Sequence, residues 1–202
     1  GGVGGLGRYL LALTVQAIVL AVADLGLTPL ATRELARPRP RTEEERFLGQ
    51  AYALKLLTSL VGMALMIVII SPLFGSDRRA ALAVAALSLP CEAHLTVSVA
   101  LMKGRQQMGA SSLLQLGTRA VATFGGMTLI LLGGDEVAAL GAYALANLLG
   151  AAVAFRILRR WELRPLWRLP GGEVQITLRE ALPFAATGIA AMLYRRVDLL
   201  LL

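Results

Sequence analysis

Charged residues are scarce in this chain of 202 residues. They make up 16% of the sequence, whereas about a quarter of the residues in an average soluble domain are charged. The charges that occur are mostly basic and give a formal net charge of +7. The arginines stand between apolar blocks and form no amphipathic basic face, so we do not expect nucleic-acid binding. The composition excludes an ordinary soluble domain.

The residues of common catalytic and metal sites are also rare. Cysteine and histidine occur once each, as Cys91 and His94. A single cysteine excludes an internal disulfide framework, and the sequence has no HExxH motif or cysteine cluster for a metal. It also has no Gly-rich loop followed by Lys-Ser/Thr, no paired acidic motifs and no evident nucleophile–base pair. We therefore expect neither an enzyme nor a bound metal or cofactor.

Apolar residues, in contrast, make up 56% of the chain and gather in long blocks, with a mean hydropathy of +0.68. Each block is close to the ~20 residues that a helix needs to cross a bilayer. No block alternates polar and apolar residues as a barrel strand would, so the sequence predicts an all-α, polytopic transmembrane helix bundle. The six predicted spans are about Tyr9–Leu30, Phe47–Leu73, Ala80–Met102, Ala110–Leu132, Val137–Leu158 and the stretch from Leu182 onward.

The loops between these spans predict an orientation. Alternate loops carry 5, 2 and 6 basic residues on one side, against 2 and 0 on the other. Because short cytoplasmic loops are rich in Lys and Arg, we expect the loops Arg33–Arg46, Lys103–Met108 and Arg156–Arg179 to be cytoplasmic. The chain starts at a glycine and stops within an apolar run. We expect it to be a fragment of a longer protein with at least one span before it.

Small residues recur within the fifth predicted span. Ala142, Ala146 and Gly150 follow one another at four-residue intervals. This spacing is typical of helices that pack closely in membranes, so we expect these residues to build the bundle and to bind nothing.

Several charges lie deep in the predicted spans, where an ion costs at least ~2.5–3.5 kcal/mol. Arg119 is about nine residues into its span, near the bilayer midplane. It is either one half of a structural ion pair, with a neighbour such as Glu92, or an anion site facing a cavity, and we favour the anion site. Lys55 is either functional or reaches back to the cytoplasmic interface. Asp24 can accept from a neighbouring helix or cap a helix break.

The third span carries two ionisable residues after Pro90, which predicts a kink. Glu92 and His94 are two residues apart, so they do not share a helix face and form at most a weak case for proton coupling.

The last span contains three charges of its own. Arg195 and Asp198 are three residues apart and can partly neutralise each other, whereas Arg196 needs a separate partner. Such a helix is tolerated where its charged side faces other helices or a wet cavity.

Two motifs resemble those of a known family. The segments LGRY and ADLGLTPLATRELAR resemble the second span of bacterial polysaccharide-exporting flippases, and LPFAATGIAAMLYRRVDLLLL resembles their seventh span. The chain is therefore similar to the oligosaccharide flippase (Wzx-type, polysaccharide biosynthesis) branch of the multidrug/oligosaccharidyl-lipid/polysaccharide exporter superfamily. The resemblance implies a two-lobe exporter with alternating access, of which this chain holds the second to seventh helices. Residues 1–160 would be N-lobe helices, 161–180 a cytoplasmic linker and 181–202 the first C-lobe helix.

The resemblance also implies a function. The protein would flip undecaprenyl-diphosphate-linked oligosaccharide across the bacterial cytoplasmic (inner) membrane, with the polysaccharide polymerase and glycosyltransferases of the pathway as further partners. The residues expected to bind the substrate are Arg119, Arg195, Arg196 and Lys55, and those expected to form ion pairs or take part in ion coupling are Asp198, Asp24 and Glu92. The family pattern has one arginine before the Asp of the seventh span and this chain has two, which leaves open whether Arg195 or Arg196 faces the cavity.

Three other functions compete with this one. A cation-coupled multidrug antiporter of the same superfamily would want an acidic cavity, whereas the deep charges here are mainly basic. A membrane-embedded lipid-sugar transferase would need acidic metal ligands or a base near a membrane surface. An inert scaffold would leave Arg119 without a purpose.

Overall fold

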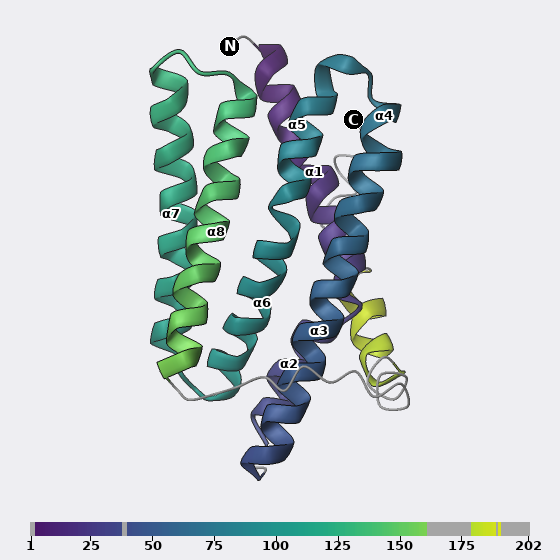
Figure 1. The fold of residues 1–202 in the computed structure, drawn as a ribbon, viewed down its shortest axis with the longest axis vertical. Coiled ribbons are helices and arrows are strands. Elements are labelled where there is room, and N and C mark those ends of the chain that lie inside the picture. The colour runs from purple at the N-terminus through teal and green to yellow at the C-terminus, as the bar shows by residue number, and fades with distance from the viewer. Residues whose placement is uncertain (1–2, 38–39, 161–178, 189, 191–202) are drawn as a thin grey trace.

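The computed structural model describes residues 3–37, 40–160, 179–188 and 190 of the chain. Within these ranges every regular element is a helix, which confirms the predicted all-α class. The long helices run side by side along one direction (Figure 1). In chain order the elements are α1 (Val3–Asp24), α2 (Leu27–Leu35), α3 (Arg41–Leu65), the π-helix η1 (Met66–Ile70), α4 (Ser71–Leu73), α5 (Ser76–Leu87), α6 (Leu89–Gly104), α7 (Met108–Leu131) and α8 (Glu136–Arg160).

A sharp corner separates α1 from α2. Leu25 and Gly26 both have left-handed backbone conformations, with φ of 47° and 74°. Position 26 also has no room for a side chain, because a Cβ there would lie 2.4 Å from the carbonyl oxygen of Ala181 and 2.5 Å from the backbone nitrogen of Ala185. Glycine is therefore required both by the turn and by the helix that packs against it. The first predicted span was thus too long at its C-terminal end, since the membrane-length helix stops at Asp24.

The second long helix runs without a break from α3 through η1 into α4. The π-turn immediately precedes Ser71-Pro72. Proline has no N–H to donate and its ring clashes with the carbonyl four residues earlier, here that of Val68. Widening the helix to a π-turn before Pro72 relieves this clash.

The third long helix is interrupted near its middle, as Pro90 predicted. α5 ends at Leu87 and α6 begins at Leu89. Between them the Ser88 hydroxyl donates to the Ala85 carbonyl at 2.8 Å. The break places the first turn of α6, with Glu92, in the interior of the bundle, where Glu92 is 7% exposed.

The helices α7 and α8 form the most extensive helix pair among the described elements. Small residues allow it, as predicted: a Cβ added to Gly150 would lie 2.4 Å from the Thr118 hydroxyl oxygen, and Ala142 packs opposite Gly125. Ala146 is buried at the same interface. These contacts fix α7 beside α8 and so set where Arg119 can reach.

Four stretches of the described chain are long and apolar enough to cross a membrane. They are Gly4–Asp24, Arg41–Leu73, Arg78–Gly104 and Glu136–Arg160. The helix α7 has 24 residues and runs alongside α8 but is not among the four. The count of six spans stays a prediction.

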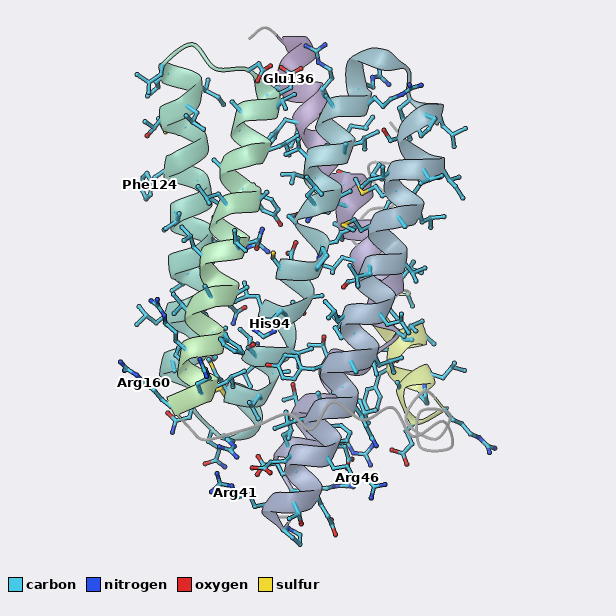
Figure 2. The ribbon with its side chains drawn as sticks, viewed as in Figure 1. Arg41, Arg46, His94, Phe124, Glu136 and Arg160 are labelled. Carbon is cyan, nitrogen blue, oxygen red and sulfur yellow. The ribbon has the colours of Figure 1, made fainter. Side chains whose placement is uncertain are left out.

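Charged residues lie at both ends of the bundle. Arg41, Arg46 and Arg160 lie at one end and Glu136 lies at the other (Figure 2). The turn between α6 and α7 joins the first of these ends, and the α7–α8 loop joins the second (Figure 1). The turn between α4 and α5 also lies at the second end (Figure 1), and Arg78 and Arg79 follow it at the start of α5. The predicted orientation therefore stays a prediction.

A helical segment at residues 179–188 packs on the corner between α1 and α2. Its Ala181 is fully buried in a cluster with Leu27, Leu30 and Leu54, and Phe184 packs against the same cluster. Most of the predicted linker 161–180 lies outside the described residues, so the division into lobes stays a prediction.

Candidate functional site

A cavity of about 540 Å³ lies inside the bundle where most of its helices meet. Side chains from α1, α2, α3, α6, α7, α8 and the 179–188 segment line it. Its charged lining residues are Asp24, Lys55, Glu92 and Arg119. The structure therefore brings together at one place the deep charges that the sequence singled out in four different helices.

Arg195, Arg196 and Asp198 lie outside the described residues. The structure says nothing about their place relative to the cavity, and their roles stay predictions.

Glu92 is the centre of a buried polar network. One carboxylate oxygen, Oε2, accepts from Gln16 Nε2 at 2.8 Å and from the Tyr143 hydroxyl at 2.9 Å. The other, Oε1, faces the Arg119 Nη2 atom at 3.3 Å. Gln16 also donates to the Ser88 hydroxyl at 2.7 Å. The Glu92 carboxylate thus connects α1, α7 and α8 to α6. Its negative charge strengthens each of these hydrogen bonds, because the interior of the bundle has a low dielectric constant.

Arg119 is held from two sides and remains accessible. Its Nη1 atom donates to the Tyr143 hydroxyl at 3.4 Å, and its guanidinium carbon lies 5.8 Å from the centre of the same ring. Yet 64% of the Arg119 side chain is exposed, compared with 9% for Glu92. The two interpretations of Arg119 are therefore compatible: the residue is paired with Glu92, and it also lines the cavity.

Lys55 forms the second ion pair of the cavity. Its ammonium group contacts the Asp24 carboxylate and lies 3.3 Å from the Thr28 hydroxyl, which itself donates to Asp24. Lys55 is 2% exposed, so it does not reach back to the cytoplasmic interface. That alternative is wrong, because the α1–α2 corner supplies a carboxylate within reach and pairing there avoids an uncompensated buried charge.

His94 belongs to a different part of the bundle from Glu92. Its ring lies 5.2 Å from that of Tyr52 and 6.4 Å from that of Phe155, and Figure 2 shows it between the helices. It is not among the residues that line the main cavity. This agrees with the prediction that Glu92 and His94 do not share a helix face.

Gln16 and Tyr143 were missed by reasoning from the sequence. Each is an uncharged polar residue in an otherwise apolar helix, and both are buried, at 2% and 8% exposure. A buried amide or phenol in a membrane helix usually hydrogen-bonds to another helix. That signal was available, but it did not identify the partner.

The described residues offer no group of three or more His, Cys, Asp or Glu side chains suited to a metal ion. The chemistry of the site, within the part that the structure describes, is that of two cation–carboxylate pairs in one cavity. Such an arrangement can bind a polar head group, with arginine and lysine as the donors and the paired carboxylates as competitors for them.

Comparison with models of known families gives a match. The family model described as polysaccharide biosynthesis protein matches residues 2–202, nearly the whole chain. Neither the curated proteins nor the solved structures gave a match.

Proposed function

The chain belongs to the polysaccharide biosynthesis protein family, and from that premise we propose that it forms part of a flippase for lipid-linked oligosaccharide. The membrane-length apolar helices and the family are typical of a membrane transport protein. The substrate would be an undecaprenyl-diphosphate-linked glycan, whose lipid tail stays in the bilayer while the head group crosses.

The observation that carries this proposal is that Arg119 lines the cavity, is accessible and is only partly engaged by its neighbours. A diphosphate must cross ~30 Å of hydrocarbon, where unpaired charge is prohibitive. Arg119 offers a permanent charge and a planar set of donors that match phosphate oxygens. Among the described residues only its terminal nitrogens are engaged, by Glu92 and Tyr143, and most of the side chain is accessible. The remaining N–H groups can therefore make the first contact with a phosphate, which then competes with Glu92 for the guanidinium.

Lys55 adds a second cation to the same cavity, held by Asp24. The two pairs make the described lining close to neutral before the substrate arrives, which allows it to exist within the membrane. An anionic head group would then exchange for Asp24 and Glu92 as the partner of Lys55 and Arg119. Arg195 and Arg196 would extend this surface, with Asp198 holding one of them.

The pairing of the carboxylates argues against a multidrug antiporter. A cationic drug needs an accessible and unpaired acid. Glu92 is buried and accepts three hydrogen bonds from Gln16, Tyr143 and Arg119. The Asp24 side chain is 21% exposed, but its carboxylate is already paired with Lys55. The accessible charge in the network is the arginine. The described cavity therefore suits an anionic ligand better than a cationic one.

The same proposal sets the location and partners of the full protein. It would span the bacterial inner membrane several times, and it would receive its substrate from glycosyltransferases and pass it to a polysaccharide polymerase.

The test is substitution of Arg119 in the full-length protein. Arg119→Ala should abolish export of the lipid-linked glycan while protein abundance and membrane insertion stay nearly unchanged, because Glu92 keeps its hydrogen bonds from Gln16 and Tyr143. Arg119→Lys should restore export only in part, since lysine keeps the charge but loses the two-pronged geometry. Arg78→Ala is the matched control, because Arg78 is an exposed arginine away from the cavity.

A purely structural arginine would behave differently. Arg119→Ala would then lower protein abundance by leaving Glu92 without its cation, and the double variant Arg119→Ala/Glu92→Gln would restore it. Full export by a stable Arg119→Ala protein would refute the proposed role of this residue.

A further inference from the structure

An apolar groove of about 280 Å³ runs between α7 and α8, the two helices that form one side of the bundle (Figure 1). The described residues that line it include none of those that line the main cavity. Gly117 lies in the groove, whereas Arg119 lines the main cavity. Residues two apart on a helix point in nearly opposite directions, so the groove opens on the other side of α7 from the main cavity.

The groove offers a ligand almost nothing but hydrocarbon. Its lining residues are apolar or glycine except Thr118, whose hydroxyl already donates to the Leu114 carbonyl at 2.8 Å. A Cβ at Gly117 would meet nothing within 4 Å, and Leu113 and Leu149 on either side are exposed. Because α8 is long and apolar enough to cross a membrane, the groove suits a lipid chain.

Two arginines continue the wall of the groove at one end. Leu149 and Val153 line it on α8, and Arg156 and Arg160 follow at the spacings of seven and eleven residues from Leu149 that keep all four on one helix face. Both arginines are exposed, and neither has a hydrogen-bond or ion-pair partner within the described chain. Figure 2 shows Arg160 at the outer edge of the bundle.

Other arginines at this end of the bundle are already neutralised. Arg41 pairs with Glu45 at 3.2 Å, and Arg105 pairs with Glu44 at 2.6 Å. Guanidinium groups bind phosphate through charge-assisted hydrogen bonds. Arg156 and Arg160, one helical turn apart, therefore form a site for an anion that comes from outside the chain.

The length of the groove matches one leaflet of a bilayer. On α7 it runs from Ala110 to Val121, which corresponds to ~16 Å at the rise of an α-helix. Half of the hydrocarbon core is ~15 Å thick. Ala110 and Ile157 pack against the same cluster, so the groove begins beside the arginines and ends near the middle of the membrane.

We propose that the α7–α8 groove binds an anionic phospholipid of the bilayer, with one acyl chain in the groove and the phosphate on Arg156 and Arg160. The lipid belongs to the leaflet at the C-terminal end of α8, which the predicted orientation makes the cytoplasmic one. Its chain lies against Thr118 and Gly150, where α7 and α8 touch most closely. Binding should therefore stabilise this helix pair.

A second copy of the chain fits this face less well. Inserted in the same orientation, it would bring its own Arg156 and Arg160 to the same depth. Like charges would then meet across the interface, which disfavours association. The charge of the site favours an anionic lipid as the occupant.

Binding of phospholipids to the purified full-length protein in neutral detergent tests the inference. The probes are dioleoylphosphatidylglycerol, which is anionic, and dioleoylphosphatidylcholine, which has the same acyl chains and no net charge. Native mass spectrometry should show that phosphatidylglycerol binds about ten- to thirtyfold more tightly, as expected for two arginines beside an anionic head group. Phosphatidylglycerol should also raise the unfolding temperature more than phosphatidylcholine does.

The double variant Arg156→Gln/Arg160→Gln tests the head-group site. It should lower the affinity for phosphatidylglycerol to that for phosphatidylcholine. The matched control is Arg78→Gln/Arg79→Gln, which removes the same charge from two exposed arginines at the start of α5. This control should keep the preference of the wild type.

Gly117→Leu tests the groove separately from the charge. The leucine fills the open space of the groove and leaves both arginines in place, so binding of phosphatidylglycerol should fall about tenfold or more. Gly141→Leu is the control, because a Cβ at Gly141 also meets nothing within 4 Å but Gly141 does not line the groove. Gly117→Met, with a more flexible side chain, replaces Gly117→Leu if the latter does not fold.

Several outcomes would overturn the inference. Equal affinity of the wild type for both lipids, or a preference that survives Arg156→Gln/Arg160→Gln, shows that the arginines bind no lipid phosphate. Unchanged binding in Gly117→Leu shows that no acyl chain lies in the groove. Displacement of phosphatidylglycerol by an equal concentration of undecaprenyl phosphate identifies the substrate lipid as the occupant, and a dimer that dissociates in Gly117→Leu identifies a second copy. These measurements do not involve glycan export, so this inference and the proposed function can fail separately.

Discussion

Glu92 on α6 pairs with Arg119 on α7 at 3.3 Å, yet the two residues differ widely in exposure, at 9% and 64% of their side chains. The carboxylate is sealed inside the bundle and the guanidinium is presented to the cavity. The pair therefore acts as a buried anchor with an accessible cation. An anion that enters the cavity meets Arg119 first and competes with Glu92 for it.

Removing the charge of Glu92 should strengthen substrate binding and weaken transport. In Glu92→Gln the competing negative charge is gone, and the one remaining acceptor oxygen is needed by the two donors Gln16 and Tyr143. We expect undecaprenyl diphosphate to bind the full-length protein roughly tenfold more tightly, the equivalent of ~1.4 kcal/mol, and glycan export to fall because release is slower. Direct binding and export measured on the same variant check this.

Glu43→Gln is the control for that prediction. It removes an exposed acid in the first turn of α3, so it makes the same change in net charge far from the cavity. Unchanged affinity for the diphosphate in Glu92→Gln would contradict the competition between Glu92 and the substrate.

The second ion pair should behave as a coupled unit. Lys55→Met leaves Asp24 without its cation and Asp24→Asn leaves a buried ammonium group, so each single variant should lose about 3 kcal/mol of stability. The double variant Lys55→Met/Asp24→Asn should recover most of that loss, because neither charge is then unpaired. Thermal unfolding of the three purified proteins measures the coupling, and additive losses in the double variant would show that the two residues do not depend on each other.

The charges of the cavity could be found from the sequence, and their partners could not. Arg119, Lys55, Asp24 and Glu92 stand out because an ion inside a long apolar block has to be explained. The sequence offers Glu92 as one possible partner of Arg119. The pairing of Lys55 with Asp24, however, depends on the corner at Leu25 and Gly26, which ends α1 earlier than the hydropathy pattern predicts.

Gln16 and Tyr143 show a second limit of prediction from the sequence. An uncharged polar residue adds little to a hydropathy profile, and whether it faces lipid or another helix depends on how its helix is rotated. That rotation is set by packing between helices, such as the fit of Gly150 against Thr118. The sequence therefore shows which helix carries each polar residue, but it does not show which residues surround the Glu92 carboxylate.

The orientation can be tested with single cysteines after Cys91 is replaced by alanine. Arg41→Cys, at the end of the bundle that also carries Arg46 and Arg160, should resist a membrane-impermeant thiol reagent added to intact cells. Asp135→Cys lies in the exposed turn before α8, at the other end, and should be labelled. Labelling of Arg41→Cys but not of Asp135→Cys would reverse the predicted topology.

The contact between α7 and α8 gives a prediction with an internal control in the same helix. A Cβ at Gly150 would lie 2.4 Å from the Thr118 Oγ1 atom and 3.1 Å from its Cγ2, and the Thr118 hydroxyl is held by the Leu114 carbonyl at 2.8 Å. Gly150→Ala should therefore force the helices apart and cost about 1–3 kcal/mol. A Cβ at Gly141 meets nothing within 4 Å, so Gly141→Ala should be neutral or stabilising by up to ~1 kcal/mol, because alanine favours the helix. Thermal unfolding of the two purified variants compares them directly.

Because Thr118 precedes Arg119, separating the helices should also displace the guanidinium, so Gly150→Ala should lose export and Gly141→Ala should retain it. Equal stability and equal export in the two variants would show that close packing of α7 on α8 does not set the position of Arg119.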